Sequence, residues 1–198
     1  RLEPGRDADE LLGRALAAMG HERIAVERPS LPLHVDVLRA TGLDVVGVRV
    51  DEEGLSVDDL TRSGASAIVA TPTHQMPLGI ALSPARRAAL LTWATARDDR
   101  LVVEDDYDAE YRYDRRPVGA LQGVAPAQVA YLGSASKTLA PALRLGWLLL
   151  PERPVADVRR QKELDDGGTE VLGQLAFARL LESAAYDSHL RRARRANR

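Results

Sequence analysis

The 198-residue chain contains no cysteine, and lysine is almost as scarce, with two residues against 25 arginines. The absence of cysteine excludes disulfide bonds and thiolate chemistry, and it is typical of a reducing compartment. No apolar run approaches the length of a membrane span, and the first residues lack the pattern of a signal peptide. We therefore expect a cytoplasmic protein with no membrane partner.

Charge and histidine spacing narrow the classes of partner. The formal net charge of −2 gives no general attraction for nucleic acid. His21, His34 and His189 lack metal-ligand spacing, so we expect no metal site. Near the end of the chain stand Arg191, Arg192, Arg194, Arg195 and Arg198. These arginines could contact phosphate, but no aromatic or groove-binding motif accompanies them, which favours a solvated or interdomain helix face.

Short apolar runs alternate with segments of helical periodicity through most of the chain. We expect strands at residues 23–27, 44–50, 67–70, 101–103, 129–132 and 145–150, and helices at 7–19, 33–41, 56–63 and 84–97. The face of the last of these helices is expected to carry Ala88, Leu91, Ala94 and Thr95. This pattern predicts an α/β fold, with a mostly parallel sheet sandwiched by helices.

A change of pattern at Pro151 suggests how the chain is organised. Helical segments at 155–164, 169–185 and 187–198 follow it without further strands. We expect one structural domain, with its core in residues 1–150 and connecting helices in residues 151–198.

Polar residues follow three of the expected strands. In parallel sheets, ligands bind outside the carboxyl ends of the strands. By this rule the candidate site is assembled from residues 71–79, 104–108 and 134–137. Lys137 lies between two apolar runs, so we expect it at the end of a buried strand, where burial favours the neutral amine that attacks carbonyl compounds.

The residues of this candidate site fit one cofactor. Pyridoxal phosphate needs an amine for its aldehyde, a carboxylate for its pyridine nitrogen, and a cation with hydroxyls for its phosphate. Lys137, Asp105, and Arg144 with Ser134 and Ser136 supply these groups. Tyr107 could donate its hydroxyl to the phenolic oxygen of the ring. Taken singly, each residue has a structural alternative: an ion-paired lysine, an aspartate that caps a turn, or a surface arginine.

Two segments carry a resemblance to a known family. Residues 103–113 (VEDDYDAEYRY) and 132–146 (LGSASKTLAPALRLG) closely resemble the aminotransferase-like domain of the MocR/GabR family. Its members are bacterial GntR-type transcription regulators, in which a winged helix-turn-helix precedes a pyridoxal-phosphate domain. The acidic-tyrosine run and residues 116–123 (RPVGALQG) point to these regulators, whereas the lysine segment matches many class I and II aminotransferases. The resemblance covers nearly the whole chain and implies the large domain of the fold-type I aminotransferase fold.

The loop at residues 71–79 (TPTHQMPLG) is similar to the family loop TPSHQxPxG. Ordinary aminotransferases have an asparagine directly before this proline, and it binds the phenolic oxygen of the cofactor. Met76 stands at that position here, as is usual for the regulators. The resemblance implies that His74 and Gln75 compensate as cofactor-binding residues, and a loop-packing role for both is equally open.

Three features depart from the family pattern. Leu31 replaces the aromatic residue that stacks on the cofactor ring. Residues 5–9 stand where a small, hydroxyl-rich turn should bind the phosphate, and the charges of Asp7 and Asp9 would repel a phosphate there. We also expect the chain to lack the winged helix-turn-helix and the small domain, toward which residues 174–178 and 189–195 would lead. These departures bear on whether the chain retains pyridoxal phosphate.

The resemblance implies an effector-sensing domain. Lys137 would hold pyridoxal phosphate as an internal aldimine, and a small amino compound would displace it to form an external aldimine. This change would bias the arrangement of the DNA-binding domains, through which alone DNA would be contacted. A homodimer is implied, because the family builds its cofactor sites at a dimer interface. The alternatives are a true pyridoxal-phosphate-dependent aminotransferase, in which Lys137 also moves a proton, and a degenerate dimerisation module without cofactor.

Overall fold

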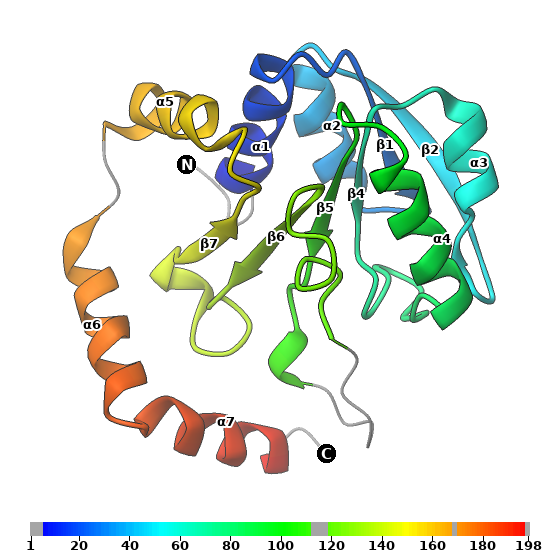
Figure 1. Ribbon diagram of the computed structural model, residues 1–198. Coiled ribbons are helices and arrows are strands. Elements are labelled where there is room, and N and C mark those ends of the chain that lie inside the picture. Colours follow the sequence, from blue (N-terminus) through cyan, green and yellow to red (C-terminus); the bar gives the residue numbers. More distant parts are fainter. Residues whose placement is uncertain (1–5, 112–118, 168–169, 197–198) are drawn as a thin grey trace.

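A seven-stranded sheet forms the centre of the molecule (Figure 1). The computed structural model describes residues 6–111, 119–167 and 170–196. The strands run in the order β3-β2-β1-β4-β5-β6-β7, and β2, β1, β4, β5 and β6 are parallel. The strands are β1 (Arg23–Arg28), β2 (Asp44–Asp51), β3 (Gly54–Leu55), β4 (Ala67–Ala70), β5 (Leu101–Asp105), β6 (Val129–Ser134) and β7 (Gly146–Leu149). The mostly parallel sheet predicted from the alternating pattern is confirmed.

The two edge strands run against the others. β3 is antiparallel to β2, and β7 is antiparallel to β6, with Gly133 opposite Trp147. β3 has only two residues and was not expected from the sequence, because so short a strand has no apolar run of its own. Since β7 is antiparallel, its first residue lies at the edge of the sheet where β6 ends.

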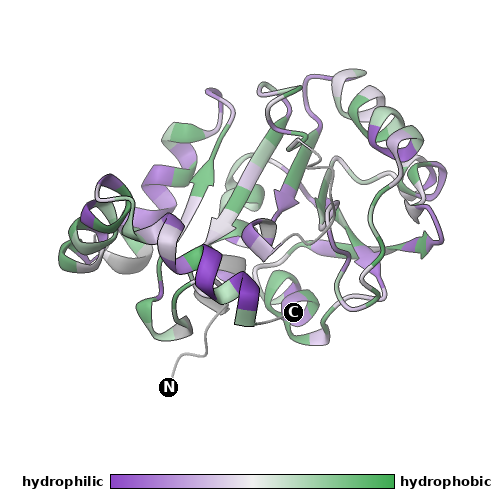
Figure 2. Ribbon diagram, turned by 90° about the horizontal axis from the view of Figure 1, so that it is seen from below, coloured by the Kyte–Doolittle hydropathy of each residue, from purple (hydrophilic) through white to green (hydrophobic). Residues whose placement is uncertain are grey.

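Helices cover both faces of the sheet. They are α1 (Arg6–Ala18), α2 (Pro32–Ala40), α3 (Val57–Ser63), α4 (Pro84–Thr95), α5 (Val155–Asp166), α6 (Val171–Glu182) and α7 (Ala185–Ala196). One apolar core includes Leu16 of α1 and Leu38 of α2, and the other includes Leu60 of α3 and Leu90 of α4. Neighbouring residues of one strand, such as Ile24 and Ala25, enter different cores. Figure 2 shows the hydrophobic strands between helices of mixed polarity.

Local capping explains where two of these helices begin. The Ser56 hydroxyl accepts a hydrogen bond from the amide of Asp59 at 3.3 Å, and Ser83 accepts one from Arg86 at 3.2 Å. Pro84 then occupies the first turn of α4, where a missing N–H costs nothing.

The expected buried face of α4 was partly wrong. Leu90, Trp93 and Ala94 are buried, whereas Ala88 and Thr95 are not. The helix turns the large indole of Trp93 toward the sheet, because this ring buries more apolar area than alanine or threonine.

The last three helices, α5, α6 and α7, follow the final strand of the sheet. α5 packs on α1, and α6 and α7 then curve along the side of the molecule below β7 (Figure 1). The division of the chain at residue 150 stays a prediction. None of the helices in the described ranges is both long and apolar enough to cross a membrane.

Candidate functional site

Three segments that the sequence places in one site follow three neighbouring strands. Residues 71–79 follow β4, residues 104–108 run from the end of β5 into the segment after it, and residues 134–137 run from the last residue of β6 into the next turn. β4 pairs with β5, and β5 pairs with β6, all in parallel. The three segments therefore meet at the carboxyl edge of the sheet, where α/β proteins bind ligands.

Asp105 and Tyr107 lie at this edge, on and just after β5. Asp105 is partly buried and pairs with Leu132 of β6 in the sheet register. The Tyr107 hydroxyl donates a hydrogen bond to the carbonyl oxygen of His74 at 3.1 Å. Burial, followed by the charges of Asp108 and Asp105, raises the pKa of Tyr107 to about 12. Tyr107 therefore stays protonated near neutral pH and acts as a hydrogen-bond donor.

His74 is held in place by Asp108. Its Nδ1 lies 2.8 Å from Oδ2 of Asp108. Because a carboxylate accepts hydrogen bonds, Nδ1 must carry the hydrogen. The His74 ring thus joins the loop after β4 to the segment after β5. The backbone carbonyl oxygen of His74 adds a second link, because it accepts the hydrogen bond from the Tyr107 hydroxyl.

Gln75 is buried and holds the same loop from inside. Its Nε2 donates to the carbonyl oxygens of Pro29 at 2.8 Å and Met76 at 2.7 Å, and its Oε1 accepts from the amide of Leu78 at 3.1 Å. These contacts use both ends of the Gln75 amide within the protein. Of the two roles left open for Gln75, the geometry favours loop packing.

Lys137 lies in the turn that follows β6, which we call the lysine turn (residues 135–139). The Ser134 hydroxyl accepts a hydrogen bond from the amide of Ser136 at 3.0 Å, so both serines are fixed on either side of Ala135. Lys137 is exposed. The expectation that Lys137 is buried is therefore wrong for this structure, because the turn carries Lys137 beyond the end of the buried strand.

Arg144 lies just before β7, at the same edge of the sheet. Its φ of 53° is in the left-handed region, which is costly for a residue with a Cβ. The next residue anchors this conformation, since the carbonyl oxygen of Leu145 accepts from the amide of Ala135 in the lysine turn at 2.9 Å. The Arg144 side chain is exposed. The Leu145–Ala135 hydrogen bond links the backbone next to Arg144 to the lysine turn.

Two buried glutamates at this edge were not predicted as structural elements of the site. Glu104 is fully buried and accepts backbone hydrogen bonds from Leu121 and Gln122, both at 3.0 Å. Burial raises its pKa, and the two amides lower it less. The turn-capping role considered for Asp105 or Asp106 thus fits their neighbour Glu104. The sequence could have indicated that Glu104 is buried, because alternate residues of a strand share a face and Glu104 shares one with the apolar Val102.

Glu27 closes the other side of the loop that follows β4. It is buried at the end of β1, and its Oε2 accepts from the amide of Thr71 at 3.1 Å and from the Thr71 hydroxyl. Burial raises the pKa of Glu27, whereas the Thr71 and Gln75 hydrogen bonds lower it. Glu27 and Gln75 together fix the loop that carries His74.

The departures from the family pattern lie near the starts of two helices. Leu31 directly precedes α2 and is 37% exposed. Residues 6–9 form the first turn of α1, and Gly5 lies outside the described residues. Of residues 116–123, positions 116–118 also lie outside them. The expected effect of Asp7 and Asp9 on phosphate binding therefore stays a prediction.

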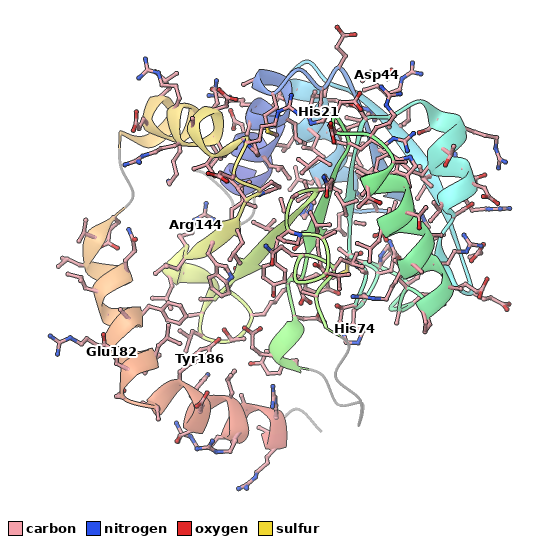
Figure 3. All side chains as sticks on the ribbon, viewed as in Figure 1. His21, Asp44, His74, Arg144, Glu182 and Tyr186 are labelled. Carbon is pink, nitrogen blue, oxygen red and sulfur yellow. The ribbon has the colours of Figure 1, made fainter. Side chains whose placement is uncertain are left out.

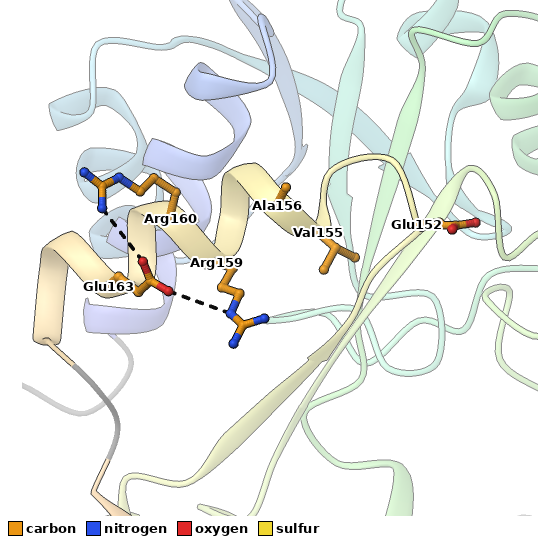
Figure 4. A pocket seen from close by; sticks show the side chains of 6 residues that line it. All are labelled: Glu152, Val155, Ala156, Arg159, Arg160 and Glu163. Carbon is orange, nitrogen blue, oxygen red and sulfur yellow. Dashed lines mark ion pairs between the residues drawn. The ribbon is translucent and has the colours of Figure 1, made fainter.

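A surface pocket lies at the opposite edge of the sheet (Figure 4). Its lining includes Val155, Arg159 and Glu163 of α5, with Arg159 Nε 3.7 Å from Glu163 Oε1. α5 follows the end of β7, which lies beside the start of β6 because the two strands are antiparallel. Figure 3 shows the two edges, with His21 and Asp44 at one and His74 and Tyr186 at the other. This pocket is therefore separate from the candidate site.

Comparison with known proteins decides the family. The model of the family "Aminotransferase class I and II" matches residues 4–196. The chain belongs to the aminotransferase class I and II family. Within the family, its curated relatives include HTH-type transcriptional regulators, so the resemblance to MocR-type regulators is confirmed.

Two of these relatives show the extent of the match. The probable rhizopine catabolism regulatory protein MocR of Rhizobium meliloti is 34% identical over 187 residues, which are 94% of this chain and 38% of the relative. The HTH-type pyridoxine biosynthesis transcriptional regulator PdxR of Corynebacterium glutamicum is 33% identical over 190 residues, 96% of this chain and 41% of the relative. The chain thus spans about two fifths of the length of these relatives.

The solved structures that it resembles include aminotransferases of the same fold. A Pyrococcus horikoshii kynurenine aminotransferase has a TM-score of 0.85 and 26% identity, covering 96% of this chain and 49% of its own. The α-aminoadipate aminotransferase LysN of Thermus thermophilus, complexed with N-(5'-phosphopyridoxyl)-L-leucine, also has a TM-score of 0.85 and 26% identity, with 96% and 50% covered. The predicted fold-type I architecture is thereby confirmed.

Proposed function

We propose that this chain is the effector-sensing, pyridoxal-phosphate-binding domain of a MocR-type transcription regulator. The observation that supports the proposal is the pairing of β5 and β6, since Asp105 ends β5, Tyr107 follows two residues later, and Lys137 lies in the turn after β6. The HTH-type regulators among the relatives favour regulation over net turnover.

The chemistry of the donor set fits the cofactor. When bound, pyridoxal phosphate withdraws electrons from an amino compound joined to its aldehyde carbon. In this chain, the exposed Lys137 amine would hold the aldehyde end, and the Asp105 carboxylate would accept a hydrogen bond from the pyridine nitrogen. Ser134, Ser136 and Arg144 would hold the phosphate group through hydroxyl and guanidinium hydrogen bonds.

Tyr107 would change partners when the site is filled. A tyrosine hydroxyl has one hydrogen to donate, and in this structure the carbonyl oxygen of His74 receives it. To donate to the phenolic oxygen of the ring, Tyr107 must release His74. Binding would therefore loosen the contact between the segment after β5 and the loop after β4, which gives the site a structural response to its ligand.

The effector would be a small amino compound, because the group held at Lys137 exchanges with amines. Two copies of the domain would form a homodimer, and a helix-turn-helix domain elsewhere in the full-length protein would contact DNA. The ligand would act by its different affinity for two arrangements of that protein. We place the domain core in residues 1–150 and the connection to other domains in residues 151–198.

A second candidate is a pyridoxal-phosphate-dependent aminotransferase, since the solved structures with a TM-score of 0.85 are aminotransferases. Here Lys137 would also carry the proton between substrate and cofactor. The two functions differ in turnover: a sensor binds the amino compound without converting a keto acid, whereas an aminotransferase converts both substrates repeatedly.

The proposal is tested by titrating the purified protein with pyridoxal phosphate and recording visible absorbance. We expect a band that is lost in Lys137→Ala and kept in Lys162→Ala, which removes the other lysine. A wild-type protein without this band would leave the chain as a dimerisation module and overturn both the sensor and the enzyme. Turnover of an amino donor and a keto acceptor by the full-length protein would select the enzyme.

A further inference from the structure

Helix α7 contacts the lysine turn through two side chains. The Tyr186 hydroxyl donates to Oγ1 of Thr138 at 2.9 Å, and Nε2 of His189 donates to the Thr138 carbonyl oxygen at 2.6 Å. Tyr186 and His189 are three residues apart, so they lie on one face of the helix. Thr138, the residue directly after Lys137, is thus held through both its side chain and its backbone.

The hydrogen bonds continue into the lysine turn. Thr138 is 1% exposed, and its Oγ1 donates to the carbonyl oxygen of Ala135 at 3.3 Å. The same carbonyl oxygen accepts the amide of Leu139 at 2.9 Å, which closes the turn around Lys137. Tyr186 is therefore the outer end of a chain of hydrogen bonds that fixes the backbone on both sides of an exposed lysine.

The same helix also reaches the segment that follows Tyr107. The Arg194 Nε donates to the carbonyl oxygen of Glu110, in the 3₁₀ turn Ala109–Tyr111. Tyr186 and Arg194 are about two turns apart on α7. One helix therefore contacts the lysine turn and the 3₁₀ turn that directly follows the segment after β5.

Aromatic packing holds Tyr186 from its other side. The Phe177 ring of α6 lies edge-on to the Tyr186 ring, with centroids 5.5 Å apart and an angle of 89°. It also stacks on Trp147 of β7 at 6.1 Å. A shift of α6 or α7 would therefore move the Tyr186 hydroxyl and, with it, Thr138.

We propose that Tyr186 and His189 are positioning residues that set the conformation of the lysine turn and couple it to α7. The inference rests on the proposed function, in which Lys137 carries the cofactor. Because coupling between two sites is reciprocal, filling the site would also change the mobility of α7. The C-terminal helices would in this way transmit the state of the site to the rest of the regulator.

The test begins without cofactor. Tyr186→Phe keeps the ring against Phe177 and removes only the hydroxyl, and His189→Phe removes the second donor. We expect each variant to raise amide hydrogen exchange at Leu139 by about fivefold, as for the loss of one hydrogen bond. Ser188 lies on the same helix and accepts a hydrogen bond from Arg191, not from the lysine turn. Ser188→Ala is therefore the control, and Leu139 should exchange in it as in the wild type.

The second arm adds pyridoxal phosphate. We expect Tyr186→Phe and His189→Phe to bind pyridoxal phosphate about fivefold more weakly than the wild type. His189→Gln should recover the affinity, because its amide can still donate a hydrogen bond. In the wild type, the amides of α7 should exchange more slowly once the cofactor is bound. Unchanged exchange at Leu139 in both variants would overturn the proposal that Tyr186 and His189 fix the lysine turn. A loosened turn with unchanged affinity and an α7 insensitive to cofactor would overturn the coupling. A wild type that binds no cofactor would contradict the proposed function. Hydrogen exchange at Leu139 without cofactor would still test whether Tyr186 and His189 fix the lysine turn.

Discussion

The indole ring of Trp147 lies directly over Gly133, at the strand pair that frames the lysine turn. The two residues are opposite each other in the antiparallel pair β6–β7, and a Cβ on Gly133 would overlap the indole ring. The same ring stacks on Phe177 of α6, so it cannot move away without disturbing that helix. The absence of a side chain at Gly133 thus allows the sheet, α6 and the lysine turn to pack together.

Gly133→Ala should therefore destabilise the protein. An extra methyl group in a packed region costs about 1–3 kcal/mol, which urea denaturation monitored by tryptophan fluorescence will measure. Gly123→Ala is the matched control, because its Cβ would meet its nearest neighbour, the carbonyl oxygen of Ala120, at an ordinary 3.7 Å. Equal stability of the two variants would contradict the packing described for Trp147.

Glu104 predicts a second effect on stability. Glu104→Ala should lower the free energy of unfolding by about 1–3 kcal/mol, because it leaves the amides of Leu121 and Gln122 without their acceptor. The exposed Glu22→Ala is the control. A loss of stability no greater than that of the control would rule out this capping role.

The same residue gives a pH dependence. Burial raises the folded-state pKa of Glu104 above its ordinary value of 4.5, so the folded protein binds this proton more tightly than the unfolded chain. The contribution of Glu104 to stability is full below pH 4.5 and declines as the pH rises through the folded pKa. The free energy of unfolding, measured at increasing pH above 4.5, should decline less in Glu104→Gln than in the wild type.

His21 acts with the opposite sign at the other edge of the sheet. It is buried beside Ser66, with Nδ1 2.8 Å from Oγ, and burial lowers its pKa from 6.5 against the attraction of Asp99. Its contribution is therefore complete above pH 6.5 and is lost as the pH falls through the folded pKa. His21→Gln, which keeps a hydrogen-bonding side chain, should lose less stability between about pH 8 and about pH 5 than the wild type. Parallel curves would contradict the burial effect.

Leu31 offers a gain-of-function test of the candidate site. Leu31→Tyr restores an aromatic ring at the position where the family stacks one on the cofactor, and stacking adds about 1 kcal/mol. We expect pyridoxal phosphate to bind about fivefold more tightly in a titration of visible absorbance. Leu33→Tyr, two residues further on and also exposed, should leave the affinity unchanged. Equal affinities for both variants would place the cofactor ring elsewhere.

Most of the sheet could be predicted because its parallel strands are buried on both faces and are therefore apolar along their length. β4 was predicted at 67–70, where the structure has it. β3 could not be predicted, because its two residues are defined by pairing with β2. The face of α4 was partly mistaken because helical periodicity alone does not say whether Trp93 or Ala88 faces the sheet.

The position of the candidate site could be predicted from the ends of the strands, whereas its contacts could not. The three segments after β4, β5 and β6 come together by sheet order. The exposure of Lys137 depends on what covers the turn, and the bonds from α7 to Thr138 join residues 48 and 51 positions apart. No local pattern carries such information, so the roles of the predicted site residues stay predictions.

The most direct measurement of the central proposal uses the scarcity of lysine. The purified protein is incubated with pyridoxal phosphate, reduced with borohydride, digested and mapped by mass spectrometry. Because the chain has two lysines, Lys137 and Lys162, the label has few places to attach. We predict that the phosphopyridoxyl group is found on Lys137, persists in Lys162→Arg, and disappears in Lys137→Arg. A label confined to Lys162, or equal labelling of both lysines, would contradict the assignment of Lys137 as the residue that holds the cofactor.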